Sequence, residues 1–282
     1  MDKMVKITAV RSDGRRFSYE NDDWGILSVD GIDFPGIEIF TKHRGFGHGD
    51  IVTGKRKSSR EIIISASEKN YTPESCDRES AIGFHNANYK FNLIIKYLNL
   101  VRIAKDCEIK LARYPTGNVY DCPEFAVTYL SPHADLFADS SELSSFVTTK
   151  ALWHDTRIYK GTGLAFGEIS KTSEIILNYL GSEPCPVNIK INASGYVDGI
   201  KVAVGGKTLN IDISLYSGDV LIIDGENREI RKNGNLIPES SYDMLTLIEL
   251  RLRYGDNTVL VDSEGNTAFT AELTYTGRYG GL

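Results

Sequence analysis

The strongest constraint on this chain is a series of short strands and glycine turns that begins at Glu174 and runs to the C-terminus. Alternating segments recur about every 8–12 residues, a spacing typical of β-sandwiches and barrels. The turns between them include Gly205-Gly206, Asp224-Gly225 and Asn233-Gly234, residues that tolerate the positive φ of hairpin turns. The pattern predicts an antiparallel β-sandwich over 174–282, with no helix of useful length. The expected strands are Ile175–Leu180, Val187–Ile191, Ile200–Val204, Lys207–Ile213, Asp219–Ile223, Arg228–Lys232, Leu245–Leu252, Asn257–Asp262 and Ala268–Tyr275.

The first part of the chain combines two periodicities. Arg60–Ala66 alternates with a period of two and is the clearest strand. A helix is predicted near Asn86–Leu98, because Tyr89, Leu93 and Tyr97 recur at four-residue spacing and form one apolar face. One main helix beside a sheet makes this part α+β. Further strands are expected at Val5–Ala9, Trp24–Val29, Ile37–Phe40, Cys107–Tyr114 and Phe125–Leu130.

The length of 282 residues suits two domains. We expect an N-terminal domain over 1–134 and a C-terminal β-sandwich over 174–282. Residues 135–173 have weak periodicity and many Ser and Thr, so we interpret them as a connection. The final strand, near Tyr275, is the segment most able to pack back on the first domain.

Charge and cysteine content exclude several classes of protein. The formal net charge is −6, which argues against a dedicated nucleic-acid binder, because such proteins neutralise phosphates with Lys and Arg. The basic run Lys55-Arg56-Lys57 is interpreted as a solvated loop. The four cysteines form no CxxC pair and indicate reduced thiols in a protein made in the cytoplasm. We expect no signal peptide and no membrane insertion.

The search for chemistry finds no complete catalytic motif. His43, His48 and Asp50 share a glycine-rich loop, but three candidate ligands without a fourth are a weak metal signal. The acids within Asp219–Glu226 lie at strand ends and turns, where acids are common in any protein. Gly161–Gly167 is too long for a dinucleotide fingerprint and lacks a βαβ context. We therefore expect no enzyme, with no catalytic residue, no metal and no cofactor.

Several motifs resemble those of phage distal tail proteins, the siphovirus-type tail components. In the second half these are the strand Pro186–Gly195 and the segment Gly218–Ile230, which is followed by the turn Asn233-Gly234. In the first half, Gly31-Ile32-Asp33 and the strand Arg60–Ile64, with the glycine-rich loop between them, are similar to the family's ring-forming N-terminal domain. The C-terminal domain also resembles lectin-like sandwiches.

The resemblance implies a structural protein of the virion tail tip, made in the cytoplasm of the host bacterium. Members of this family form a homohexameric ring that joins the tail tube protein to the hub or tail-associated protein. Receptor-binding proteins attach at the periphery in some cases. DNA passes through the ring without specific binding, and the acidic charge fits this passage, because a basic lumen would hold phosphates.

The loop Arg44–Asp50 is the candidate subunit interface. Its three glycines make ordering the loop costly in entropy, and an exposed Phe46 gains little in a free monomer. Burying an aromatic side chain in a neighbour is worth roughly 1.5–3 kcal/mol. We therefore predict that Arg44, Phe46 and His48 contact an adjacent subunit or the tube protein. The alternative is a plain surface turn with Phe46 packed into its own domain.

Two other functions compete with the tail role. The first is a carbohydrate-binding β-sandwich that contacts saccharides on the host surface. Tyrosines exposed on one face of the sandwich would favour it, whereas buried tyrosines would not. The second is a secreted glycoside hydrolase, which the lack of a signal peptide disfavours. Fold alone cannot choose between these functions.

Overall fold

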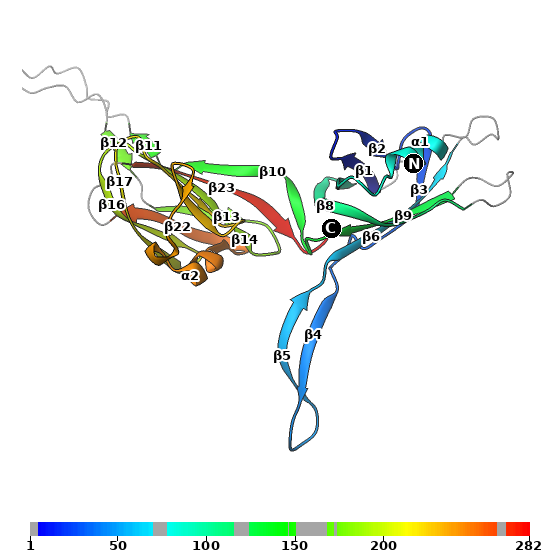
Figure 1. Ribbon diagram of the computed structural model, residues 1–282, viewed down its shortest axis with the longest axis horizontal. Helices are drawn as coiled ribbons and strands as arrows, with labels where there is room; N and C mark the ends of the chain where they lie inside the picture. The colour runs from blue at the N-terminus through cyan, green and yellow to red at the C-terminus, as the bar shows by residue number, and fades with distance from the viewer. Residues whose placement is uncertain are drawn as a thin grey trace, which may run out of the picture. The chain divides into compact units, whose positions relative to one another are not determined.

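The computed structural model describes residues 5–69, 78–115, 124–145, 147–150, 168–171, 174–263 and 269–282. The chain forms two compact units (Figure 1). The first contains residues 1–139 and 278–282, and the second contains residues 140–277. Each unit has a buried apolar core of its own. The expected fold class, mainly β with antiparallel sheets, is confirmed.

The first unit contains two antiparallel sheets that share strand β8 (Leu100–Arg113). The first half of β8 pairs with β7 (Phe91–Tyr97), and its second half pairs with β9 (Glu124–Ser131). Asp106 lies between the halves with a positive φ of 53°, which interrupts the extended backbone. The sheets run β2-β1-β7-β8 and β3-β6-β9-β8, and β10 joins the edge of β8. The remaining bounds are β1 (Val5–Arg11), β2 (Arg16–Ser18), β3 (Trp24–Asp30), β6 (Arg60–Glu68), α1 (Arg78–Phe84) and β10 (Leu136–Ser145).

The helix predicted near Asn86–Leu98 is wrong, because Phe91–Tyr97 forms strand β7 and the helix is α1, a few residues earlier. Phe91, Leu93 and Ile95 are buried, and the residues between them are more exposed. In so short an apolar run, the helical period of 3.6 residues and the strand period of two residues both fit the sequence. Pairing with β1 on one side and β8 on the other supplies the backbone hydrogen bonds that favour the strand.

A hydrogen-bonded histidine lies inside the aromatic core of the first unit. His85 Nδ1 donates to the carbonyl of Ala81 at 2.7 Å, so Nε2 is the acceptor for the Tyr19 hydroxyl at 2.6 Å. The Tyr19 hydroxyl in turn contacts the Tyr129 hydroxyl at 2.7 Å. Burial lowers the pKa of His85 to about 4, so the ring is neutral near pH 7.

Arg60, the first residue of β6, is a buried cation that contacts four backbone carbonyls. Arg60 is 2% exposed, and its guanidinium donates to the carbonyl oxygens of Gly31, Asp33, Ala134 and Gly280. These carbonyls come from the turn after β3, the segment before β10 and the C-terminal end of the chain. Gly31 has a φ of +83°, and a Cβ there would lie 1.8 Å from the carbonyl oxygen of Glu61, so this turn requires glycine.

The second unit is a sandwich of two antiparallel sheets. One sheet runs β13-β22-β16-β17, and the other contains β23-β15-β18-β19-β20. Buried Val, Ile and Leu side chains from both sheets meet in one core. The bounds are β11 (Val147–Lys150), β12 (Glu168–Lys171), β13 (Glu174–Tyr179), β14 (Cys185–Pro186), β15 (Asn188–Ala193), β16 (Val197–Val204), β17 (Lys207–Leu215), β18 (Val220–Asp224), β19 (Glu229–Lys232), β20 (Asn235–Leu236), η1 (Glu239–Ser241), α2 (Met244–Glu249), β21 (Arg251–Leu252), β22 (Gly255–Ser263) and β23 (Phe269–Tyr279).

The strand expected at Leu245–Leu252 is wrong over most of its length, because Met244–Glu249 is the short helix α2. Asp243 caps this helix, and its carboxylate accepts from the backbone amides of Leu245 and Thr246. Asp is a strong N-cap residue, so this start signal was present in the sequence.

Strands β10 and β23 each contain residues of both units. β10 begins in the first unit and ends in the second, and β23 runs from the second unit into the first. Residues 278–282 therefore belong to the first unit, whereas the sequence assigned all of 174–282 to one domain. Residues 146, 151–167 and 172–173 of the expected connection lie outside the described residues.

Two of the four cysteines can be placed. Cys107 and Cys185 are buried, and burial raises the pKa of the Cys107 thiol to about 12. Cys76 and Cys122 lie outside the described residues. In the described part of the chain, no helix is long and apolar enough to cross a membrane.

We predict that Arg60→Ala lowers the free energy of unfolding of the first unit by about 3 kcal/mol, because buried carbonyls lose their donors. Chemical denaturation followed by the fluorescence of Trp24, which is 3% exposed, measures this change. A Trp153→Phe background leaves Trp24 as the only tryptophan. The exposed Arg15→Ala variant is the control, and equal stability of the two variants would contradict the prediction.

A second prediction concerns acid. Between pH 6.5 and 4 the unfolded chain protonates His85 and the folded chain does not, so stability is complete above pH 6.5 and falls as the pH drops. The loss from this residue is about 3 kcal/mol across the window. We expect the difference in unfolding free energy between the parent and His85→Gln to shrink as the pH falls to 4. A difference that stays constant with pH would contradict this assignment.

Candidate functional site: an exposed basic hairpin

The hairpin of β4 (Ile37–His43) and β5 (Asp50–Lys57) is the most exposed regular element of the first unit. The two strands form a sheet of their own, with Ile37 opposite Lys57 at the base and His43 opposite Asp50 at the tip. Every residue of β4 is exposed, and β5 is exposed except for two half-buried positions. Figure 1 shows the hairpin standing out beyond β6. Its stability as a lone two-stranded sheet is marginal, so a partner would stabilise it.

Both faces of the hairpin carry large apolar side chains. Ile37, Ile39 and Val52 lie on one face by strand alternation and register, and Phe40 and Ile51 lie on the other. These five side chains are between 49% and 56% exposed. Contiguous exposed apolar surface marks interaction sites, and the outer edges of the two strands carry backbone groups suited to pairing with another chain.

The tip holds the three predicted interface residues, Arg44, Phe46 and His48, and all of them are exposed. Phe46 is 100% exposed, which excludes the alternative that it packs into its own domain. His43 Nδ1 lies 2.6 Å from Asp50 Oδ1 and closes the loop at its base. The loop therefore presents an aromatic ring that has no partner in the described part of the subunit.

The hairpin is basic in an acidic chain. Between Ile37 and Lys57 there are five basic residues, Lys42, Arg44, Lys55, Arg56 and Lys57, and two acidic ones, Glu38 and Asp50, which gives +3. With a total of −6, the rest of the chain carries −9. The sequence interpretation of Lys55-Arg56-Lys57 as a loop is wrong, since these residues belong to β5. The β-branched run Ile51-Val52-Thr53 was the signal for that strand.

The base of the hairpin is fixed to the first unit. Ser58 donates to the carbonyl of Gly36 through its backbone amide at 2.9 Å and its hydroxyl at 3.0 Å. Lys57 Nζ lies 2.9 Å from Asp135 Oδ1. Arg60, two residues after Ser58, donates to the carbonyls of Gly31 and Asp33 in the turn that precedes β4. These contacts anchor the hairpin at its base and leave its length and tip exposed.

The residues considered for chemistry have other roles. Asp50 contacts His43 at the tip, and among the described residues no group of three or more His, Cys, Asp or Glu could hold a metal ion. Asp224 accepts from the backbone amides of Glu226 and Asn227, as turn acids do. Gly161–Gly167 lies outside the described residues.

Comparison with known proteins bears on both units. Residues 180–279 match the family model described as siphovirus-type tail component, C-terminal domain. No curated protein matches the chain. The crystal structure of the SPP1 phage protein Dit (gp 19.1), described as a paradigm of the hub adsorption apparatus in phages that infect Gram-positive bacteria, has a TM-score of 0.66 at 12% identity, covering 96% of this chain and 98% of that one. The phage p2 baseplate in its activated conformation with Ca has a TM-score of 0.47 at 8% identity, covering 99% of this chain and 100% of that one.

At 12% identity the likeness to SPP1 Dit shows the fold, and it extends over almost the whole length of both chains. The family match covers most of the second unit, including the segments Pro186–Gly195 and Gly218–Ile230, from which the sequence predicted the family. Residues 180–279, most of the second unit, therefore match the C-terminal domain of siphovirus-type tail components, and the chain has the fold of SPP1 Dit.

Proposed function

We propose that the chain is the distal tail protein of a long-tailed phage. In this role it forms a homohexameric ring at the virion tail tip, between the tail tube protein and the hub or tail-associated protein, with receptor-binding proteins at the periphery. DNA passes through the ring without specific binding, and the role requires no catalytic step. The family match of the second unit and the fold of the whole chain support a structural tail component.

The exposed hairpin is the observation that carries the ring proposal. A closed ring needs two different surface patches on each subunit, which meet around a rotation axis. The hairpin supplies one patch, which is apolar and basic. The second patch must be complementary to an apolar and basic surface, so it combines exposed apolar side chains with carboxylates.

The outer face of the sheet β3-β6-β9-β8 has this composition. Ile63 and Leu111, 37% and 43% exposed, lie in register on either side of Thr128. In a neighbouring row Glu61 and Glu108 flank Leu130 in the same way. We infer that the hairpin of one subunit binds this face of the next through its Ile39 face, with Lys55 near Glu108. Glu61 is already paired with Lys110 of its own subunit.

The first test of the ring removes the aromatic side chain at the tip. Phe46→Ala should weaken assembly about tenfold or more, because the ring loses the burial of one aromatic group at each interface. The melting temperature of the monomer should stay unchanged, since Phe46 is fully exposed there. Native mass spectrometry and negative-stain images of full-length chains, mixed with the tail tube protein where needed, measure the sixfold species. Leu245→Ala, which removes a side chain that is 73% exposed on α2, is the control. Normal rings formed by Phe46→Ala would contradict the proposal.

The second test reverses charges. Lys55→Glu should weaken ring assembly most strongly at low salt, because surface ion pairs are screened above about 0.1 M. Adding Glu108→Lys to the same chain should restore assembly if the two residues face each other across the interface. Failure of the double variant to recover, with both single variants folded, would reject the sheet face as the second patch and leave the hairpin as the first.

A further inference from the structure

The second unit carries a pair of exposed tyrosines that the ring does not need. Tyr196 and Tyr216 are 52% and 61% exposed, and their ring centroids lie 5.5 Å apart at an interplanar angle of 52°. Tyr196 directly precedes β16 and Tyr216 directly follows β17, next to the paired residues Val197 and Leu215. Two aromatic rings are thus held side by side, each with about half of its surface exposed, and Lys232 Nζ lies 5.6 Å from the centroid of the Tyr216 ring.

The turns that carry these tyrosines are tied together. Gly218 donates to the carbonyl of Ala193, and Ala193 donates to the carbonyl of Asp219, each at 2.9 Å. The Asp219 carboxylate accepts from the backbone amide of Tyr216 at 2.9 Å and from Asn233 Nδ2 at 2.7 Å. These hydrogen bonds hold the pKa of Asp219 at about 2. The turns are ordered before any ligand arrives, which reduces the entropy cost of binding.

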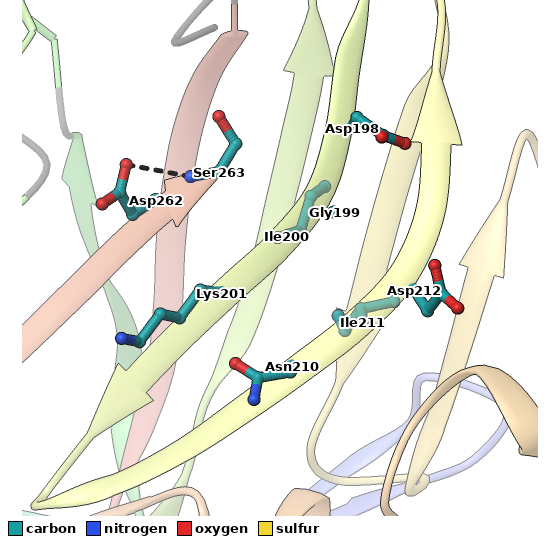
Figure 2. Close-up of a pocket in the computed structure, with 9 residues that line it drawn as sticks. All are labelled: Asp198, Gly199, Ile200, Lys201, Asn210, Ile211, Asp212, Asp262 and Ser263. Carbon is teal, nitrogen blue, oxygen red and sulfur yellow. Dashed lines mark hydrogen bonds between the residues drawn. The ribbon is translucent and has the colours of Figure 1, made fainter. Parts of the chain in front are cut away.

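A polar hollow lies on the same sheet, and its lining begins at Asp198, two residues along the chain from Tyr196. Its volume is about 560 Å³, within the range of small-molecule sites. Strand β16 has a bulge between Asp198 and Ile200, where Gly199 takes a φ of 59°. Figure 2 shows the carboxylates of Asp198 and Asp212 on one side of the hollow, with Gly199 and Ile200 between them and Lys201.

The hollow offers hydrogen-bonding groups of several kinds. Lys201 lies in register with Asn210 on one neighbouring strand and with Asp262 on the other, so an ammonium, an amide and a carboxylate form one row. Asp198 accepts from the hydroxyl of Ser214 at 2.8 Å and connects this hollow to the tyrosine pair, because Ser214 is two residues from Tyr216. Three carboxylates and one lysine give the hollow a charge of −2.

We propose that the tyrosine pair and the adjoining hollow form a binding site for neutral saccharides. The C–H face of a pyranose ring is apolar and fits against an aromatic ring, while its hydroxyls donate to carboxylates and accept from amide and ammonium groups. A short oligosaccharide places one sugar on Tyr196 and Tyr216 and the next in the hollow near Asp198 and Asp212. The negative charge of the hollow repels phosphate- or uronate-containing polymers. The site goes beyond the proposed tail role and does not depend on ring formation.

The test uses the full-length chain with trisaccharides of glucose, of galactose and of N-acetylglucosamine as probes. Saturation-transfer NMR detects binding, and calorimetric titration at millimolar concentrations measures affinity. At least one trisaccharide should bind. Tyr216→Ala and Tyr196→Ala should each weaken that binding about tenfold, as expected for the loss of one aromatic contact. Tyr216→Phe keeps the ring and should bind as the parent does.

Matched controls separate the site from general effects. Tyr254 is 75% exposed and directly precedes β22, at the end of that strand opposite to Asp262 and Ser263, which line the hollow. Tyr254→Ala should therefore leave binding unchanged. Asp198→Asn should weaken binding with no change in melting temperature. The proposal is overturned if none of the probes binds, if binding survives both tyrosine-to-alanine variants, or if poly(glycerol phosphate) binds more tightly than the neutral probes. It is also overturned if those variants lose only association with tail proteins, because this face would then be a protein-docking surface.

Discussion

The guanidinium of Arg60 is the contact on which the arrangement of the first unit depends. Four carbonyl oxygens from three separate parts of the chain point at it, and it is almost completely buried. A buried cation is costly unless its donors are satisfied, and burial lowers the pKa of Arg60 for this reason. Because one of its acceptors is Gly280, the C-terminal end of the chain is held against the turn at Gly31 and Asp33. The same turn leads into β4, so this contact also fixes where the hairpin starts.

The hairpin is the consequence of that anchoring. Arg60, Ser58 and Lys57 fix the base of the hairpin to the first unit. The two strands can therefore extend away from the unit although they have no hydrophobic core of their own. Ile39 and Phe40 remain exposed on opposite faces, an arrangement that is unfavourable in a free subunit and useful in an assembly. The second unit is instead a sandwich of two antiparallel sheets. Buried side chains of its two sheets meet in one core, and a bulge at Gly199 and a hydrogen-bonded turn at Asp219 shape one outer face.

Much of the fold follows from local pattern. Alternating residues and Gly-containing turns predict most strands of the second unit, because one face of each strand is buried and the turns require positive φ. The motifs from Pro186 to Ile230 predict the family that the comparison found. The glycine-rich tip left open whether Phe46 packs into its own domain, and in the structure its ring is fully exposed. Asp243 as an N-cap and the run Ile51–Thr53 as a strand were readable signals that the sequence interpretation missed.

Other features exist only in three dimensions. Phe91–Tyr97 is a strand because β1 and β8 lie on either side of it, and no local pattern decides this in so short a run. The contact between Arg60 and Gly280 joins residues 220 positions apart, which no local period encodes. Tyr196 and Tyr216 become a pair only through the register of β16 and β17. The sequence by itself determined most strands and turns of the second unit, because these depend on short-range sterics and burial, and its motifs there indicated the family whose model matches residues 180–279. Tertiary structure alone decided which distant groups meet, because those contacts depend on strand order and register.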